Sequence, residues 1–251
     1  MKSPKLIIYF LLMLAITSNT ACKKKGTSPL GSSHLLFVNR TNSNGDATYY
    51  RITYGAGNNV DSIISTGGGT DTGYKNYLTF TYLNSSYIIT DKSNDQTTVH
   101  LSSSVTIDSI FYGSSTAYTY IQYNGGQVGA VNDEMPIPAY PYYTLNIYDY
   151  TYANNNITAI NTTGASQAYD YNMAQKGQLG DPQRIDEFLK LGRTYTASAN
   201  LATDLFNNGS WLEKYFYQLD GNGRITLMTR VINNTSGGAN DTLRYAYTYN
   251  F

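Results

Sequence analysis

The chain has 251 residues, a single cysteine, and equal numbers of basic and acidic side chains, 17 of each. Only 14% of its residues are charged, and the lack of a basic excess argues against nucleic acid as a partner. A single cysteine excludes an internal disulfide. The 26 tyrosines outnumber the 8 phenylalanines and 1 tryptophan, which suits a sheet face where the ring packs and the hydroxyl meets water.

Residues 1–21 have the pattern of a secretory signal peptide. Lys2 and Lys5 precede an apolar run at 6–16, and small or polar residues follow. The run is too short to span a bilayer, which takes about 20 apolar residues. Removal of this segment leaves 15 basic and 17 acidic side chains, a net charge of about −2.

Ala21 and Cys22 at the end of this segment resemble the cleavage site of a bacterial lipoprotein signal. That resemblance implies that Cys22 carries a diacylglyceryl group and becomes the first mature residue. Asn19 departs from the aliphatic residue usual at that position. A plain signal peptide with a free thiol is the alternative.

Residues 22–33 have no hydrophobic pattern and predict a lipid-anchored, flexible tether. In some Gram-negative lineages, acidic residues just after the acylated cysteine resemble a signal for export to the cell surface. Lysines occupy positions 23–25 here. We therefore expect an outer-membrane lipoprotein on the periplasmic side rather than at the cell surface.

Residues 34–251 predict one all-β domain. An aromatic strand, an Asn/Gly turn and an aliphatic strand recur along the chain, which is typical of antiparallel hairpins. We expect a large curved antiparallel sheet, either an open half-barrel or a closed barrel. The predicted strands lie at 35–38, 49–54, 60–64, 77–83, 87–90, 97–101, 105–112, 118–123, 127–131, 143–152, 157–160, 215–219, 225–231 and 243–251.

Two segments interrupt this rhythm. Residues 132–142 carry three prolines, which lack an amide donor, so we expect an extended crossing segment or an edge that divides the sheet into two lobes. Residues 181–192 predict one short helix packed on the sheet. Asp181 is a candidate N-cap, Pro182 suits the first helical position, and Gly192 can close the end.

The hairpin at 217–226 resembles the tyrosine–aspartate (YD, or Rhs-type) repeat, with Leu219 in place of the second tyrosine. The whole plan is similar to a family of uncharacterised outer-membrane lipoproteins. The shared features are the lipid-attached cysteine, the tyrosine-rich hairpins, a Tyr-Asp pair before a short helix, here Tyr169-Asp170, and a final Tyr-x-Tyr strand. The resemblance implies a fold and a location, and no activity.

The sequence contains little that indicates catalysis. His34 and His100 lack metal-ligand spacing, and no G-x-S-x-G nucleophile turn is present. We expect no metal site, no cofactor and no enzymatic activity. The alternative is a polysaccharide-active enzyme that uses two paired carboxylates. The candidate acids are Asp133, Glu134, Asp181, Asp186, Glu187, Asp204 and Glu213.

Aromatic side chains are the candidates for ligand contact, because flat rings stack on sugars and line grooves for amphiphiles. These candidates are Tyr148, Tyr150, Tyr152, Trp211, Tyr245, Tyr247 and Tyr249. Three Asp-Ser/Thr-aliphatic triplets are similar to an O-glycosylation signal on exported proteins and place candidate sites at Ser62, Ser109 and Thr242. The alternative for each triplet is an ordinary strand entry.

These observations favour a lipid-anchored binding or scaffold protein of the cell envelope. The expected partners are the membrane, through the acylated cysteine, and a glycan, a lipid or another envelope protein. The alternatives are the paired-carboxylate enzyme and a purely structural envelope component.

Overall fold

The computed structural model describes residues 34–67, 74–103, 106–113, 117–137, 140–235 and 237–250. It divides into two units, of which Leu35–Thr248 is the larger. In the small unit, the backbone N–H groups of His34 and Asn250 donate to the Oδ1 of Asn250 and the carbonyl of His34, respectively. Residues 1–33 lie outside the described residues, and so do the predicted signal peptide, Cys22 and the tether.

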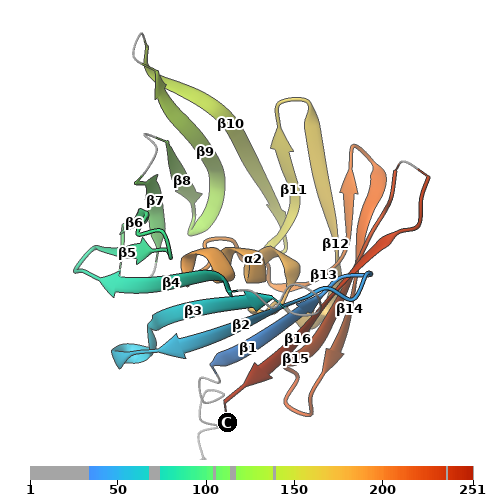
Figure 1. Cartoon of the computed structure of the whole chain (residues 1–251). Coiled ribbons are helices and arrows are strands. Elements are labelled where there is room, and N and C mark those ends of the chain that lie inside the picture. The colour runs from blue at the N-terminus through green and yellow to red at the C-terminus, as the bar shows by residue number, and fades with distance from the viewer. Residues whose placement is uncertain are drawn as a thin grey trace, which may run out of the picture. The chain divides into compact units, whose positions relative to one another are not determined.

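The larger unit is an all-β barrel, which confirms the predicted fold class. Within the described residues, sixteen antiparallel strands follow one another around a closed ring that brings β1 beside β16 (Figure 1). The strands are β1 (Leu35–Thr41), β2 (Ala47–Tyr54), β3 (Val60–Gly67), β4 (Tyr74–Tyr82), β5 (Ser86–Thr90), β6 (Gln96–Leu101), β7 (Ile107–Tyr112), β8 (Tyr118–Asn124), β9 (Gln127–Ile137), β10 (Tyr140–Ala153), β11 (Asn156–Thr162), β12 (Ala165–Lys176), β13 (Asn200–Asn207), β14 (Ser210–Leu219), β15 (Ile225–Ile232) and β16 (Asp241–Tyr249).

The connections between strands alternate between the two ends of the barrel, because every neighbouring pair is antiparallel. We call the end where β1 begins the base. It carries the β2–β3, β4–β5 and β14–β15 turns and a longer connection between β12 and β13. We call the opposite end the rim.

Side chains along each strand alternate between the lumen and the outer face of the wall. Across β1, β2 and β3, Val38 pairs with Tyr50 and Tyr50 with Ser65 on the lumen face. The adjacent row pairs Phe37 with Arg51 on the outer face. The lumen face holds aliphatic residues and many of the tyrosines, while others, such as Tyr49 and Tyr120, are exposed on the outer face.

A helix, α2 (Pro182–Leu191), lies inside the ring of strands, in the connection between β12 and β13 (Figure 1). Its ends follow the prediction. The Asp181 carboxylate accepts from the Arg184 N–H at 3.1 Å, Pro182 opens the helix, and Gly192 closes it at φ 67° with its N–H donating to the Phe188 carbonyl. Among the described residues, no helix is long and apolar enough to cross a membrane.

The apolar side of α2 anchors it to the wall near the base. Its buried residues are Ile185, Phe188, Leu189 and Leu191. Burial of each such side chain contributes roughly 1.5–3 kcal/mol. Hydrogen bonds hold both flanks. Tyr87 donates to the Leu191 carbonyl at 2.8 Å, and Tyr247 donates to the Gly180 carbonyl at 2.9 Å. The connection is therefore fixed to two separate parts of the ring, on β5 and β16.

The proline-rich segment does not divide the sheet into two lobes, so that part of the prediction was wrong, whereas the expected edge is confirmed. β9 runs on to Ile137, β10 begins at Tyr140, and the two strands pair with each other in a long hairpin. The pairing of β9 with β8 ends at Glu134, and that of β10 with β11 begins only at Asp149. The hairpin tip thus has free edges, where a proline without an N–H is tolerated.

The sequence analysis did not predict two of the strands, β12 and β13. Both flank α2 and complete the ring between β11 and β14. The YD-like hairpin forms β14 and β15, and its Asp220 carboxylate accepts from the N–H groups of Asn222 and Arg224, each at 2.9 Å. That turn therefore uses its own acid to close the hairpin.

Replacing Gly192 by alanine should destabilise the barrel strongly. The residue has a positive φ, and an added Cβ would lie 2.7 Å from Cε1 of Phe80, whose ring is buried. The left-handed backbone costs a non-glycine residue about 1–2 kcal/mol. Overpacking adds about 1–3 kcal/mol. Urea unfolding of Gly192→Ala measures the sum.

Gly164 provides the matched control for this variant. It also has a positive φ, 84°, but an added Cβ would meet nothing within 4 Å. Gly164→Ala should therefore lose only the backbone contribution. Equal losses for the two variants would contradict the close packing of α2 against β4.

Candidate functional site

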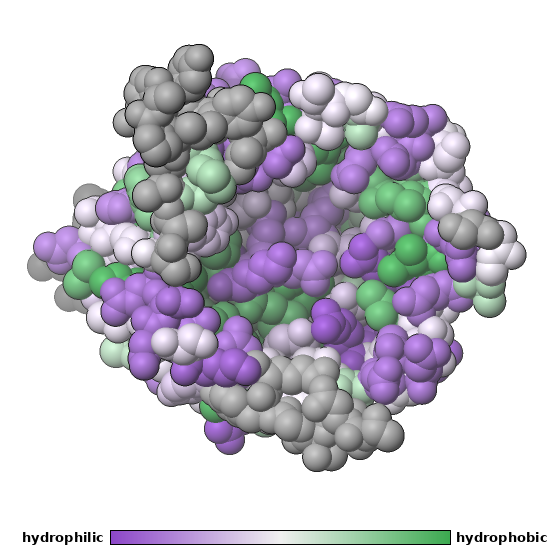
Figure 2. Space-filling view, turned by 45° about the horizontal axis from the view of Figure 1, so that its top comes forward, coloured by the Kyte–Doolittle hydropathy of each residue, from purple (hydrophilic) through white to green (hydrophobic). Residues whose placement is uncertain are grey.

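The lumen between α2 and the rim is hollow (Figure 2). One part of it, which we call the lumen cavity, has a volume of about 600 Å³ and lies between α2 and the wall from β4 to β10. Two neighbouring cavities of about 300 Å³ and about 380 Å³ border other sides of α2. Asp186 lines all three. The helix therefore presents Asp186 to a branched, open space.

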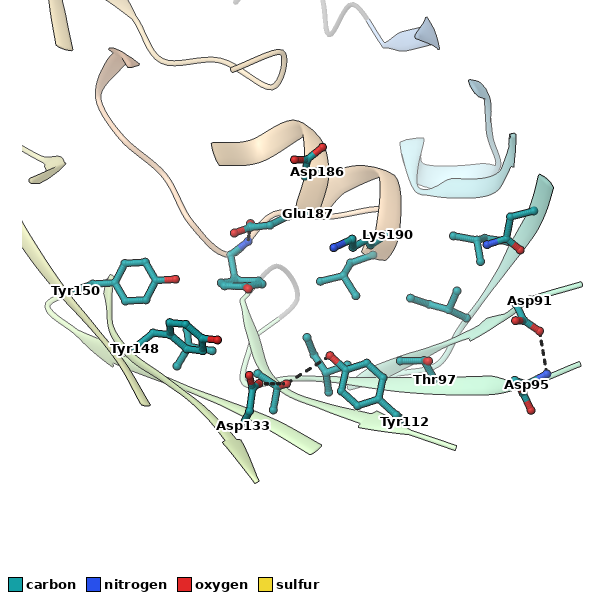
Figure 3. A pocket seen from close by; sticks show the side chains of 18 residues that line it. Asp91, Asp95, Thr97, Tyr112, Asp133, Tyr148, Tyr150, Asp186, Glu187 and Lys190 are labelled. Carbon is teal, nitrogen blue, oxygen red and sulfur yellow. Dashed lines mark hydrogen bonds between the residues drawn. The ribbon is translucent and has the colours of Figure 1, made fainter. Parts of the chain in front are cut away.

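The lumen cavity combines three kinds of side chain. Its aliphatic lining includes Leu78, Ile89, Ile110 and Val131. Tyrosine rings and carboxylates lie around them (Figure 3). The tyrosines are Tyr112, Tyr148, Tyr150 and Tyr195, and the charged residues are Asp91, Asp95, Asp133, Asp186, Glu187 and Lys190.

The tyrosines near the base use their hydroxyls to bond the protein itself. Tyr54, Tyr123 and Tyr217 donate to the carbonyls of Leu35, Ile107 and Ala202 at distances of 3.0, 2.6 and 2.7 Å. Each bond ties a strand end to a neighbouring strand. These tyrosines have a structural role in the base.

Four of the tyrosines around the cavities differ in this respect. In the part of the chain that the structure describes, the hydroxyls of Tyr148, Tyr150, Tyr169 and Tyr195 have no hydrogen-bond partner. Burial raises the pKa of the Tyr150, Tyr169 and Tyr195 hydroxyls, so they stay protonated donors at any physiological pH. A half-buried hydroxyl without a protein partner is ready to bond a ligand or water.

Glu187 joins α2 to the segment that follows it. Its Oε2 accepts from the N–H groups of Tyr195 and Thr196 at 2.9 and 3.1 Å, and its Oε1 accepts from the Thr196 hydroxyl at 2.6 Å. Burial raises the pKa of Glu187 to about 7, although these hydrogen bonds work in the opposite direction. This carboxyl therefore holds the cavity wall in place.

An ion-paired group borders the smaller cavity on the β14–β15 side. Arg230 contacts Glu213 directly, and Tyr215 donates to the other Glu213 oxygen at 2.5 Å. The Arg230 Nη1 also lies 3.6 Å from Asp186 Oδ2. Glu213 is buried and its charge is matched by Arg230, which stabilises this group as a unit.

On the opposite wall, the carboxylates have no such cation. Asp133 accepts from the Thr119 hydroxyl at 2.7 Å, and Thr119 shares a hydrogen bond of 3.3 Å with Tyr112. Near the rim, Asp91 accepts from the N–H groups of Ser93 and Asp95 in its own turn. These acids reach the cavity without an ion-pair partner among the described residues.

The structure separates the predicted contact residues. Tyr148 and Tyr150 line the lumen cavity. Tyr152 lies beyond them towards the base, where burial raises its pKa to about 12. Tyr245 and Tyr247 are buried against the base, while Tyr249 belongs to the small unit. Trp211 has the Lys214 Nζ 5.1 Å above its ring and lines none of the three cavities.

The candidate glycosylation residues all lie in strands. Ser62 is buried and hydrogen-bonds Thr53 at 2.7 Å. Ser109 donates to Asp108 at 3.0 Å, and Thr242 is half-buried in β16. Their modification stays a prediction.

The candidate acids are also dispersed. Asp133, Asp186 and Glu187 meet at the lumen cavity, and Glu213 lines its neighbour. Asp181 caps α2, and burial raises its pKa to about 6. Glu134 accepts from Tyr118, and Asp204 pairs in register with Lys214. The sequence did not single out Asp91, Asp95, Lys190 or Tyr195, whose approach depends on barrel closure.

No family model and no curated protein matches the chain. The resemblance to YD repeats and to the lipoprotein family therefore stays a prediction. Among solved structures, 17 chains match. One is a porin-like protein from Bacteroides uniformis ATCC 8492, 14% identical, with a TM-score of 0.62 over 86% of this chain and 98% of that chain. At this identity, the likeness shows a shared barrel fold.

The pKa of Glu187 predicts how stability varies with pH. Its pKa of about 7 in the folded state exceeds the ordinary value of 4.5 for a glutamate in water, so the folded state binds this proton more tightly than the unfolded state. The resulting stability is complete below about pH 4.5 and is lost as pH rises through about 7. The loss is on the order of 3 kcal/mol. Glu187→Gln should remove this part of the pH dependence.

Urea unfolding of both proteins at pH 4.5 and pH 7.5 measures this effect. The difference between the two proteins isolates Glu187 from Asp181, which titrates in the same direction. The same loss of stability with pH in both proteins would contradict the assignment.

Proposed function

We propose that this chain is a non-enzymatic binding protein of the cell envelope, anchored by a lipid on Cys22, which holds a ligand in the lumen cavity. The observation that carries the proposal is the open cavity of about 600 Å³ lined by tyrosine hydroxyls without protein partners. Ligand sites typically have volumes of about 300–1,000 Å³ and an apolar lining with a few convergent polar groups. The lumen cavity has these properties.

The base of the barrel supports binding rather than conduction. α2 and its flanks cross the lumen there and bond β5 and β16. Arg193, just after α2, donates to Asn59 in the β2–β3 connection at 3.1 Å. A ligand entering from the rim meets α2 as a floor.

The outer face of the wall supports a barrel surrounded by water. Charged side chains lie on the outer face within the strands. In one row, the exposed Asp170 of β12 pairs with the half-buried Asp204, and Asp204 pairs with the exposed Lys214. Others are Arg51, Asp149 and Arg244. A lysine or arginine facing lipid costs a membrane barrel about 2–4 kcal/mol at the bilayer midplane. This wall therefore suits a lipid-tethered barrel better than a bilayer-spanning one.

The chain enters the barrel at the base, where β1 begins. A lipid on Cys22 would tether the molecule through that end of the chain and leave the rim free to receive a ligand. Our proposal of the periplasmic side of the outer membrane rests on the lysines at 23–25 alone.

A polysaccharide-active enzyme is the second candidate, because three of the acids predicted for it, Asp133, Asp186 and Glu187, meet in one cavity. Its two acids would have to flank a scissile bond. Against it, Glu187 is bound to its own loop by three donors, and Asp186 lies beside Arg230. Binding makes use of the same groups and needs no pair of acids free to exchange protons.

A matched pair of tyrosine variants tests the binding site. Tyr150→Phe removes a hydroxyl without a protein partner, so stability should change by less than about 0.5 kcal/mol. Tyr217→Phe removes the bond to the Ala202 carbonyl and should cost about 1 kcal/mol. Native mass spectrometry of mature protein, gently extracted from its own membrane, should show a bound molecule as an extra mass that dissociates on activation. The fraction of protein that carries this mass should fall in Tyr150→Phe and stay unchanged in Tyr217→Phe. A clean mass equal to the acylated chain would count against the binding function.

The outer wall gives a separate prediction about solubility. A variant in which a signal peptide cleaved without lipid attachment replaces residues 1–22 should leave the membrane fraction and purify without detergent, because the charged wall meets water. The unaltered protein should partition into detergent. A variant that stays in the membrane fraction and needs detergent would show that the wall itself contacts lipid.

A further inference from the structure

The lumen cavity carries an unbalanced charge. Its lining holds four aspartates and Glu187 against one ammonium group, Lys190. The aspartates and Lys190 alone leave three negative charges. Glu187, with a pKa of about 7, adds part of a fourth at neutral pH. A ligand that brings positive charge would relieve this excess.

The carboxylates surround the cavity from three sides (Figure 3). Asp133 lies on β9, Asp91 and Asp95 belong to the β5–β6 turn at the rim, and Asp186 lies on α2. Among the described residues, the one hydrogen bond to the Asp133 carboxylate comes from a neutral group, the Thr119 hydroxyl. Its remaining acceptor sites can receive N–H donors from a ligand, and a cationic donor makes the stronger bond.

A second observation is independent of these charges. Tyr148, Tyr150 and Tyr195 line the same cavity, and their hydroxyls have no protein partner in the described part of the chain. Tyr169, on the far side of α2, repeats this in the adjoining cavity. Each hydroxyl can donate and accept, and each ring offers an apolar face. These groups match a ligand that has both hydroxyls and flat apolar ring faces.

We infer that the lumen cavity binds a short oligosaccharide of amino sugars whose amines are free and protonated. The ring faces would stack on the tyrosines, the sugar hydroxyls would bond the tyrosine hydroxyls, and the ammonium groups would meet Asp133 and the rim aspartates. A cavity of this size holds a drug-sized molecule, or about two sugar rings. The inference rests on the proposed binding function and specifies its ligand.

Two sugar dimers of equal length separate charge from shape. The β-1,4 dimer of glucosamine carries two ammonium groups, and its N,N′-diacetyl form keeps the hydroxyls and rings without the charge. Isothermal titration of the full mature protein at pH 6.5 and low salt should give at least about tenfold tighter binding of the amine dimer. The preference should shrink as NaCl rises, because salt screens the charges near the rim.

Charge-removing variants place the effect in the cavity. Asp133→Asn should reduce affinity for the amine dimer about tenfold and leave the acetylated dimer unaffected. Asp95→Asn, at the exposed rim, provides a second variant should Asp133→Asn fail to fold. Asp170→Asn removes an exposed charge from the outer wall and should change neither affinity.

The remaining outcomes distinguish this inference from the proposed function. Equal binding of both dimers, or tighter binding of the acetylated one, would overturn the cationic ligand and leave the binding function standing. If neither dimer binds and the native protein carries a bound neutral molecule, the cationic ligand is overturned and the binding function again stands. Failure of both dimers with no bound mass would overturn the inference and the binding function together.

Discussion

The width of the barrel is the constraint on which the rest of the structure depends. Side chains of about eight strands can fill a barrel interior, whereas sixteen strands enclose a space that they cannot fill. The wall of this protein closes with sixteen strands in the described residues. Its interior must therefore contain water, another segment of the chain, or a ligand. The connection between β12 and β13 fills the base, and the space above α2 remains open.

That division gives the tyrosines two roles. At the base, Tyr87, Tyr217 and Tyr247 bond backbone carbonyls and help to fix α2 and the strand ends. Around the cavities, Tyr150 and Tyr169 present hydroxyls without a protein partner. Tyrosines thus help to close the barrel at its base and line the open cavities towards its rim. The difference lies in whether a carbonyl is within reach, which depends on height along the strand.

The fold also shows why a barrel likeness leaves function open. The porin-like protein from Bacteroides uniformis shares the architecture at 14% identity. A wall in contact with lipid needs an apolar band. The strands of this wall carry exposed charges, among them Arg51, Lys214 and Arg244, and also exposed rings such as Phe37 and Phe216. The character of a barrel is set by which side chains occupy the outer half of the alternation, and strand order alone does not determine it.

The sequence by itself determined the local structure. The alternating strands, the Asn/Gly turns and the whole of α2, from the Asp181 cap to Gly192, follow from near neighbours in the chain. Barrel closure, the path of the proline-rich hairpin and the strands β12 and β13 were decided by tertiary structure. So was the cavity, since Asp91, Asp133 and Asp186 come from separate elements. Their meeting depends on register summed around the whole ring, and pairing between distant strands leaves no local mark in the sequence.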